Sequence, residues 1–130
     1  MTRPHYPRPF PIQRIKSDCF SACLSWLLDL DQDQVPDFTD PVNPKSGVFF
    51  ENVNRWLGER GFRLMMLSWD NAPSWWLQGP VIASGTSPRE GMHAVLWDDD
   101  GLLHDPHASR AGIVGDPKWA MLILASPKLT

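Results

Sequence analysis

The sequence predicts an α+β domain in which N-terminal helices pack on a C-terminal antiparallel sheet. In the first half of the chain, apolar residues recur at spacings of three and four, the period of a helix with one buried face. In the second half, short apolar runs are separated by turn residues, which is typical of strands. Helices followed by strands favour segregated layers, and 130 residues are enough for one core.

A proline-rich arm opens the chain. Its prolines are Pro4, Pro7, Pro9 and Pro11. Each proline removes a backbone donor and disfavours helix in the residue before it. We therefore expect residues 1–12 to be extended and residues 13–130 to form a single domain.

The first helix follows two residues that favour the N-cap position, Ser17 and Asp18. The apolar residues after them form one stripe: Phe20, Cys23, Leu24, Leu27 and Leu28. A polar run over residues 29–34 and then Pro36 end this helix. A second helix is expected over about residues 48–60, with Gly61 at its C-terminal cap. Strands are expected over residues 62–69, 80–84, 92–97, 102–105 and 119–125.

Charge and hydropathy exclude several classes of partner. The net charge is −3 and no basic stripe is present, so a nucleic-acid partner is not expected. No stretch approaches the roughly 18–20 apolar residues of a membrane span, and the N-terminus lacks the apolar core of a signal peptide. We therefore expect a cytoplasmic protein that does not bind membranes.

Cys19 is the candidate nucleophile. It falls in the first turn of the first helix, where unpaired backbone N–H groups and the helix dipole favour negative charge. The pKa of its thiol should therefore be lowered, which favours the reactive thiolate. A buried cysteine that only packs is the alternative. Cys23 lies one turn further along the buried stripe, and we assign it to the core.

The spacing of the two cysteines on one helix is poorly suited to a disulfide, so both thiols should be free. A zinc site would need them to join histidines of a distant hairpin, and that alternative stays open. The histidines in question are His93, His104 and His107. The leading expectation is thiol chemistry without a metal or cofactor.

His93 is the candidate base and Asp105 its orienting acid. A three-residue loop over 99–101, with a left-handed Gly101, would place Asp98 opposite Leu102. Under that register His93 and Asp105 lie on one face as diagonal neighbours. A two-residue loop would put them on opposite faces.

The imidazole of His93 could give one N–H to Asp105 and turn its other nitrogen toward Cys19. His104 then falls on the opposite face, with a structural role. His107 is the reserve base, because it lies just beyond Pro106.

Gln13, in the approach to the helix, could supply an oxyanion donor with its side-chain amide. Gln13 precedes Cys19 by six positions. Residues 79–106 contain Gly-Pro and an apolar run, then His93 with apolar residues after it, then a turn and Asp105 before Pro106.

This order resembles papain-like cysteine peptidases, in particular the bacteriocin-leader (double-glycine) peptidase family and its stand-alone relatives. The resemblance implies a papain-like fold with Cys19 as nucleophile, His93 as base, Asp105 as orienter and Gln13 at the oxyanion. The chain departs from the family pattern at Phe20, where relatives usually have Gly.

The expected function is cleavage of a peptide or isopeptide bond in a protein or peptide substrate, through an acyl-thioester on Cys19. A protein side-chain amidase or deamidase would use the same residues. A non-catalytic protein-binding module, such as a phage or bacterial effector, is a further alternative that Phe20 supports. The sequence indicates neither the substrate's identity nor the oligomeric state.

Three tryptophans are candidates for substrate binding. Trp75 and Trp76 lie in the connection between two strands, where they could cover the sheet edge or form a wall of a cleft. Trp97 lies four residues from His93 on the same strand face, where it could shield the His–Asp pair from water.

Overall fold

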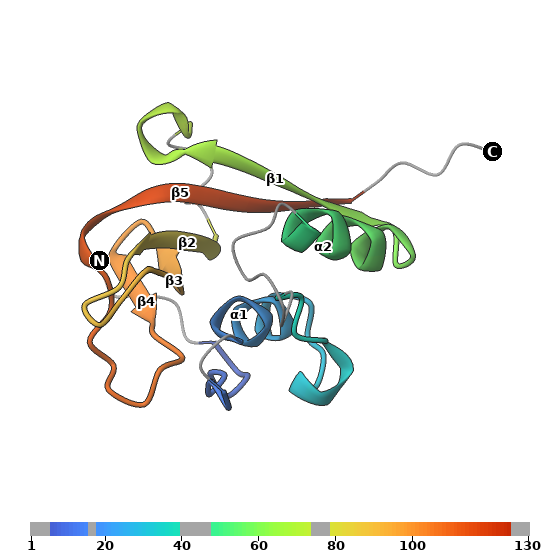
Figure 1. The fold of residues 1–130 in the computed structure, drawn as a ribbon, viewed down its shortest axis with the longest axis horizontal. Coiled ribbons are helices and arrows are strands. Elements are labelled where there is room, and N and C mark those ends of the chain that lie inside the picture. The colour runs from blue at the N-terminus through green and yellow to red at the C-terminus, as the bar shows by residue number, and fades with distance from the viewer. Residues whose placement is uncertain (1–5, 16–17, 40–47, 74–78, 126–130) are drawn as a thin grey trace.

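Two helices pack against a five-stranded antiparallel sheet in the described part of the chain, and this confirms the expected α+β class (Figure 1). The computed structural model describes residues 6–15, 18–39, 48–73 and 79–125. The helices are α1 (Cys19–Leu27) and α2 (Val48–Gly58), with single 3₁₀ turns η1 (Gln32–Gln34) and η2 (Trp69–Asn71). The strands are β1 (Phe62–Ser68), β2 (Val81–Thr86), β3 (Met92–Asp98), β4 (Gly101–His104) and β5 (Val114–Ala125). Their order in the sheet is β1-β5-β2-β3-β4.

The core lies between the two helices and one face of the sheet. Helix α1 contributes Phe20, Cys23 and Leu24, all at most 5% exposed. The buried partners from α2 and the sheet are Val53, Leu57, Ile82, Ala94, Leu96 and Met121. Because strand side chains alternate between faces, Ala94 and Leu96 point to the helices, whereas His93 and Val95 belong to the other face.

Helix α1 begins and ends as the sequence indicates, although its cap differs. Asp18 occupies the N-cap position, but its carboxylate makes no capping bond. It accepts instead the backbone N–H groups of Arg14 and Ile15, at 3.2 and 3.3 Å. At the other end, the N–H of Leu30 donates to the carbonyl of Ser25 at 2.9 Å. Asp29 (φ +56°) takes the left-handed position of this Schellman-type end.

Strand β5 begins five residues earlier than the expected strand at 119. Its first part pairs through Val114 with Thr86 of β2, across a register shift between Ser84 and Thr86. Gly115, at φ +71°, lies in this irregular part. A bulge leaves residues unpaired and locally disrupts the ladder. Residues 114–118 carry no apolar alternation, so the sequence pattern predicted the strand only from residue 119.

The β3–β4 turn is shorter than expected. Asp98 pairs with Gly101 and not with Leu102, so the predicted three-residue loop is wrong. The register then shifts, because Leu96 pairs with His104 while Trp97 pairs with Leu102. This bulge adds one residue to β4. At His104 the register is therefore the one that the longer loop would have produced. As a result, Asp105 lies on the same face of the hairpin as His93.

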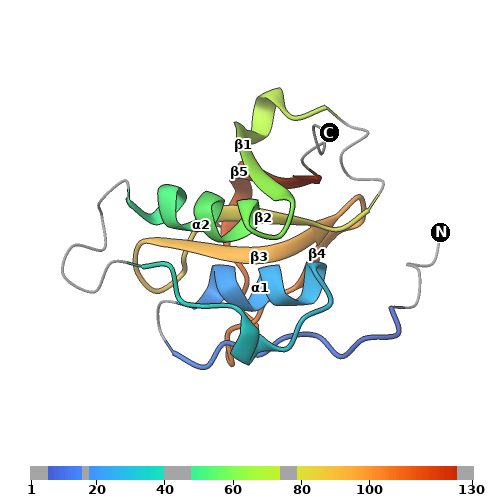
Figure 2. The ribbon, with the colours of Figure 1, turned by 90° about the vertical axis from the view of Figure 1, so that its right-hand side faces the viewer.

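The described part of the arm, residues 6–12, has no helix or strand and runs alongside α1 (Figure 2). Phe10 stacks on both His104 and Trp26, with ring centroids 4.8 and 5.3 Å apart. The Nε2 of His104 lies 2.7 Å from the carbonyl of Pro11. His104 is therefore half-buried and structural, and it attaches the arm to β4.

Candidate active site

A buried histidine–aspartate pair is the centre of the candidate site. Nε2 of His93 lies 2.6 Å from Oδ1 of Asp105, and the two side chains are only 4% and 1% exposed. His93 comes from the start of β3, and Asp105 follows the last residue of β4. The predicted pairing of these two residues is thus present in the structure.

Two backbone N–H groups also bind the Asp105 carboxylate. That of His107 donates to Oδ1 at 2.9 Å, and that of Gly112 donates to Oδ2 at 2.7 Å. Burial by itself raises the pKa of Asp105, but the bonds from His93, His107 and Gly112 outweigh it and leave the pKa below its usual value. The carboxylate is therefore an ionised acceptor at neutral pH.

The ionised carboxylate selects one tautomer of His93. Because an ionised carboxylate only accepts hydrogen bonds, Nε2 of His93 must carry the hydrogen that lies between the two side chains. In the neutral ring Nδ1 is then unprotonated and able to accept a proton. This is the tautomer that a general base oriented by a carboxylate requires.

Cys19 begins helix α1, and its thiol contacts the backbone of Ala94, the residue after His93. Strand β4 pairs only with Leu96, Trp97 and Asp98 of β3, so β4 does not cover the backbone at Ala94. Both cysteines of α1 contact the strand at this residue. Sγ of Cys23 lies 3.9 Å from the Ala94 carbonyl oxygen. The short β4 strand thus allows α1 to approach β3 closely.

The expectation that the pKa of Cys19 is lowered is wrong for this structure. Burial raises the pKa of the thiol above its usual value, and the backbone groups of Ala94 and Phe20 lower it by less. The helix N-terminus acts in the predicted direction, but the cost of burying a thiolate is greater. At neutral pH the resting sulfur is therefore a thiol, which needs a base to become a nucleophile.

The Cys19 thiol contacts β3 at Ala94, and the imidazole of His93 projects from the preceding residue on a different side of the strand. Cys19 approaches from the helix side, whereas the alternation of β3 directs His93 to the face that it shares with Gly85 and Asp105. Within the described ranges no hydrogen bond joins Sγ of Cys19 to His93. Contact between them stays a prediction, since catalytic hydrogen bonds often form only when a substrate is bound.

Gln13 lies close to the same site. Its backbone N–H donates to the carbonyl of Pro106 at 2.8 Å, which brings it next to the residue after Asp105. Its side-chain Nε2 donates to the carbonyl of Ile15 at 2.8 Å. This bond uses one of the two N–H donors of the amide, and the predicted role of Gln13 as an oxyanion donor stays a prediction.

His107, the reserve base, lies at the edge of the pair. Its ring centroid is 6.2 Å from that of His93, with the rings nearly perpendicular. Its Nδ1 accepts the N–H of Ser109 at 3.0 Å. Since Nδ1 is engaged as an acceptor, the neutral ring carries its hydrogen on Nε2. His107 is therefore poorly placed to replace His93 as a base through Nδ1.

Of the three candidate tryptophans, the structure describes Trp97 only. Its ring packs edge-to-face against Trp69, with centroids 5.8 Å apart. Trp75 and Trp76, predicted to cover the sheet edge or to form a wall of a cleft, lie outside the described residues.

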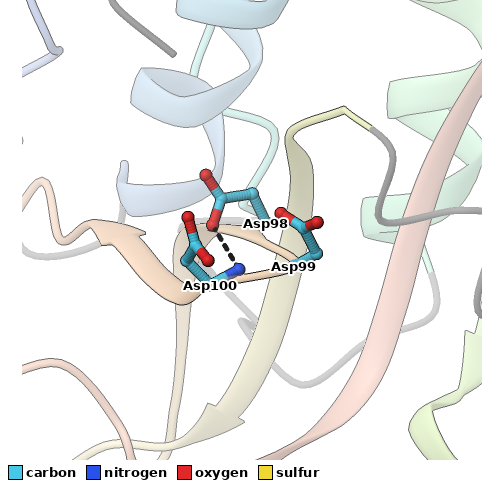
Figure 3. A group of neighbouring side chains, drawn as sticks. All are labelled: Asp98, Asp99 and Asp100. Carbon is cyan, nitrogen blue, oxygen red and sulfur yellow. Dashed lines mark hydrogen bonds between the residues drawn. The ribbon is translucent and has the colours of Figure 1, made fainter. Parts of the chain in front are cut away.

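A zinc site would need at least three ligands close together, and the cysteines and histidines of the described residues form no such group. Among the described residues, the one set of three metal-ligating side chains that lie close together is Asp98, Asp99 and Asp100, at the β3–β4 turn (Figure 3). The carboxylate of Asp98 accepts the N–H of Asp100 at 3.0 Å, so this cluster has a role in the turn itself.

Several residues around the pair were not predicted from the sequence. Gly112 donates to Asp105, and Arg110 bonds to the carbonyls of Asp105 and His107. Ile113 packs on Gly85, the cross-strand partner of His93. A glycine inside an apolar strand is a known sign of close approach, so Gly85 could have been noticed. No comparable signal marks Arg110.

No protein-family model, curated protein or solved structure matches this chain. The structure itself defines an α+β domain, with two helices on a five-stranded antiparallel sheet in its described part. In that domain, the thiol of Cys19 at the start of α1 contacts Ala94 of β3, and the neighbouring residue His93 belongs to the buried His–Asp pair.

Proposed function

We propose that the chain is a papain-like thiol hydrolase that cleaves peptide or isopeptide bonds, with Cys19 as nucleophile, His93 as base and Asp105 as orienter. One observation carries the proposal: a buried, ionised carboxylate holds the His93 ring in the tautomer of a general base, one residue from the backbone that the Cys19 thiol contacts.

The first half of the reaction forms the acyl-thioester. Nδ1 of His93 takes the proton from the thiol of Cys19, and the sulfur attacks the substrate carbonyl carbon. The C–S bond forms as the carbonyl electron pair moves to oxygen. When this pair returns, the C–N bond breaks and the amine leaves with the proton held by His93. The first N–H groups of α1 have no partner within the helix and can donate to the developing oxyanion.

The second half returns the enzyme to its resting state. His93 removes a proton from water, and the hydroxide oxygen bonds to the thioester carbon. The C–S bond then breaks, the carboxylic acid leaves, and His93 returns its proton to the sulfur of Cys19. Asp105 keeps its negative charge throughout and stabilises the imidazolium that forms twice in the cycle.

The raised pKa of Cys19 makes the role of the base testable. A buried thiol without help is less ionised than a model thiol at every pH below its own pKa, and it should react more slowly. If His93 accepts the proton, Cys19 instead becomes reactive near neutral pH. Cys19 should therefore react more slowly than the model thiol if it has no base, and faster than the model thiol if His93 accepts its proton.

The experiment is alkylation with iodoacetamide at pH 6, with the modified residue identified by mass spectrometry. We expect Cys19 to react faster than N-acetylcysteine, and His93→Ala to bring its rate below that of the model thiol. Cys23 is 0% exposed and serves as an internal control that should stay unmodified in the folded protein. A Cys19 that reacts more slowly than the model thiol in the wild-type protein would refute catalysis.

That same outcome would favour the second candidate function, a non-catalytic protein-binding module. One observation supports it: the burial that keeps Cys19 protonated. Phe20, where relatives of the resembled family usually have Gly, packs in the core. A side-chain amidase or deamidase is a variant of the leading proposal and uses the same three residues. A panel of electrophilic peptide and ubiquitin-like probes would separate these substrates by which probe labels Cys19.

A further inference from the structure

The loop over residues 105–112 folds back around its own first side chain. The N–H of His107, two residues after Asp105, and the N–H of Gly112, seven residues after it, both donate to the Asp105 carboxylate. These two donors hold the carboxylate in the orientation in which Oδ1 meets Nε2 of His93. The position of Asp105 therefore depends on how this loop closes.

Arg110 makes the bonds that close the loop. Its Nη1 donates to the carbonyl oxygens of Asp105 and His107, at 2.8 and 2.7 Å. Its own N–H donates to the carbonyl of His107 at 3.0 Å. The side chain thus links the beginning of the loop to the turn that leads to Gly112.

The backbone of Arg110 is strained in this arrangement. Its φ is +56°, in the left-handed region that residues with a Cβ rarely occupy unless surrounding contacts hold them there. Arginine lacks the short polar side chain that lets Asn and Asp adopt this conformation. Strained residues cluster at functional sites, where they hold a geometry that the site needs.

We propose that Arg110 is a positioning residue, which closes the 105–112 loop so that Asp105 receives both backbone donors and orients His93. It acts through Asp105 and touches neither the thiol nor a substrate. The expected effect of Arg110 on the reactivity of Cys19 rests on the proposed function, whereas its expected effect on the His93 ring does not.

The test compares four variants by a property of His93 that needs no activity. Nitrogen-15 NMR of the imidazole reports which ring nitrogen carries the hydrogen, and we expect wild-type His93 to be the Nε2–H tautomer. Arg110→Ala and Arg110→Gly should both mix the two tautomers. Arg110→Lys should keep most of the wild-type signal, because an ammonium group can also donate to two carbonyls. Arg89→Ala is the matched control, because Arg89 donates to Ser109 in the same loop but not to Asp105 or His107.

The glycine variant separates the side-chain bonds from the backbone strain, since glycine adopts φ +56° without cost. If Arg110→Ala does not fold, Arg110→Gly and Arg110→Lys together still test the proposal. A wild-type tautomer in Arg110→Gly would overturn the proposal, because the guanidinium would then be unnecessary. A change in Arg89→Ala equal to that in Arg110→Ala would also overturn it.

Alkylation of Cys19 supplies the second measurement. In Arg110→Ala and Arg110→Gly we expect a rate lower by about tenfold at pH 6, the scale of one lost hydrogen bond to a charged group. If wild-type Cys19 is unreactive, the proposed function fails while the NMR still decides the role of Arg110. If wild-type Cys19 is reactive and both variants keep its full rate, the positioning role fails alone.

Discussion

Ile113 occupies the space that a Cβ of Gly85 would need, and Gly85 is the residue that pairs with His93 across β2 and β3. A Cβ added to Gly85 would lie 2.7 Å from Cδ1 of Ile113 and 3.3 Å from its Cβ. Cross-strand partners share one face of a sheet. The residue before β5 therefore covers the face to which His93 points, and a glycine at position 85 makes this close approach possible.

Gly85→Ala should destabilise the protein by about 1–3 kcal/mol, because the added methyl group must displace Ile113 from a packed position. Urea unfolding followed by circular dichroism measures the loss. Pairing the change with Ile113→Ala should recover part of it, since the shorter side chain removes the clash.

Gly58→Ala is the matched control. Gly58 is the last residue of α2, and a Cβ there would meet nothing within 4 Å. Alanine in a helix is more stable than glycine by about 0.5–1 kcal/mol, so this variant should unfold at slightly higher urea. Equal losses in both variants would show that the contact with Ile113 is not the cause.

Asp105→Asn should destabilise the protein by about 1–3 kcal/mol, the cost of leaving a buried donor unsatisfied. The amide has one acceptor oxygen, whereas the carboxylate accepts from His93, His107 and Gly112. The pKa of Asp105 is lowered in the folded state. Its contribution to stability is therefore present above the pKa of an unfolded aspartate, about 3.9, and is lost as the pH falls through the folded value.

Urea unfolding between pH 2 and pH 7 measures this dependence. The free energy of unfolding of the wild-type protein should fall below about pH 4, and Asp105→Asn should show a smaller fall over the same range. Identical pH profiles for the two proteins would contradict the lowered pKa of Asp105.

Stability should also decline at alkaline pH, because burial raises the pKa of both thiols in the folded state. A raised pKa stabilises the folded protein fully below the unfolded thiol pKa, about 8.5, and this contribution is lost as the pH rises through the folded value. Cys19→Ala and Cys23→Ala should each reduce the decline between pH 8 and pH 10, and Cys23 should contribute more. An unchanged slope in the double variant would rule out the thiols as its source.

Phe10→Ala should loosen the N-terminal arm while the sheet stays intact, since Phe10 stacks on His104 and Trp26. Faster tryptic cleavage after Arg14, which closely follows the arm, with unchanged far-ultraviolet circular dichroism, is the expected result. Ile12→Ala is a suitable control, because Ile12 is 56% exposed and its loss should leave the cleavage rate unchanged. Equal cleavage of the wild-type protein and Phe10→Ala would show that other contacts hold the arm.

The sequence alone determined the features that depend on local periodicity and backbone chemistry. The apolar period specified a helix with Phe20, Cys23 and Leu24 buried, and the prolines before Gln13 exclude helix from the described part of the arm, because both effects act within a few residues. The burial of Ser21, Ser25 and Trp26 on the rest of α1 was not predicted from the stripe. The separation of helices from strands along the chain likewise determined the α+β class.

Only the tertiary structure decided how these elements meet. The bulge that returns Asp105 to the face of His93 depends on pairing along the whole β3–β4 hairpin, not on the turn residues alone. The direction of the Cys19 pKa depends on how closely α1 packs on β3, since burial acts against the helix terminus. The role of Arg110 comes from contacts between carbonyl groups that converge only when the loop closes.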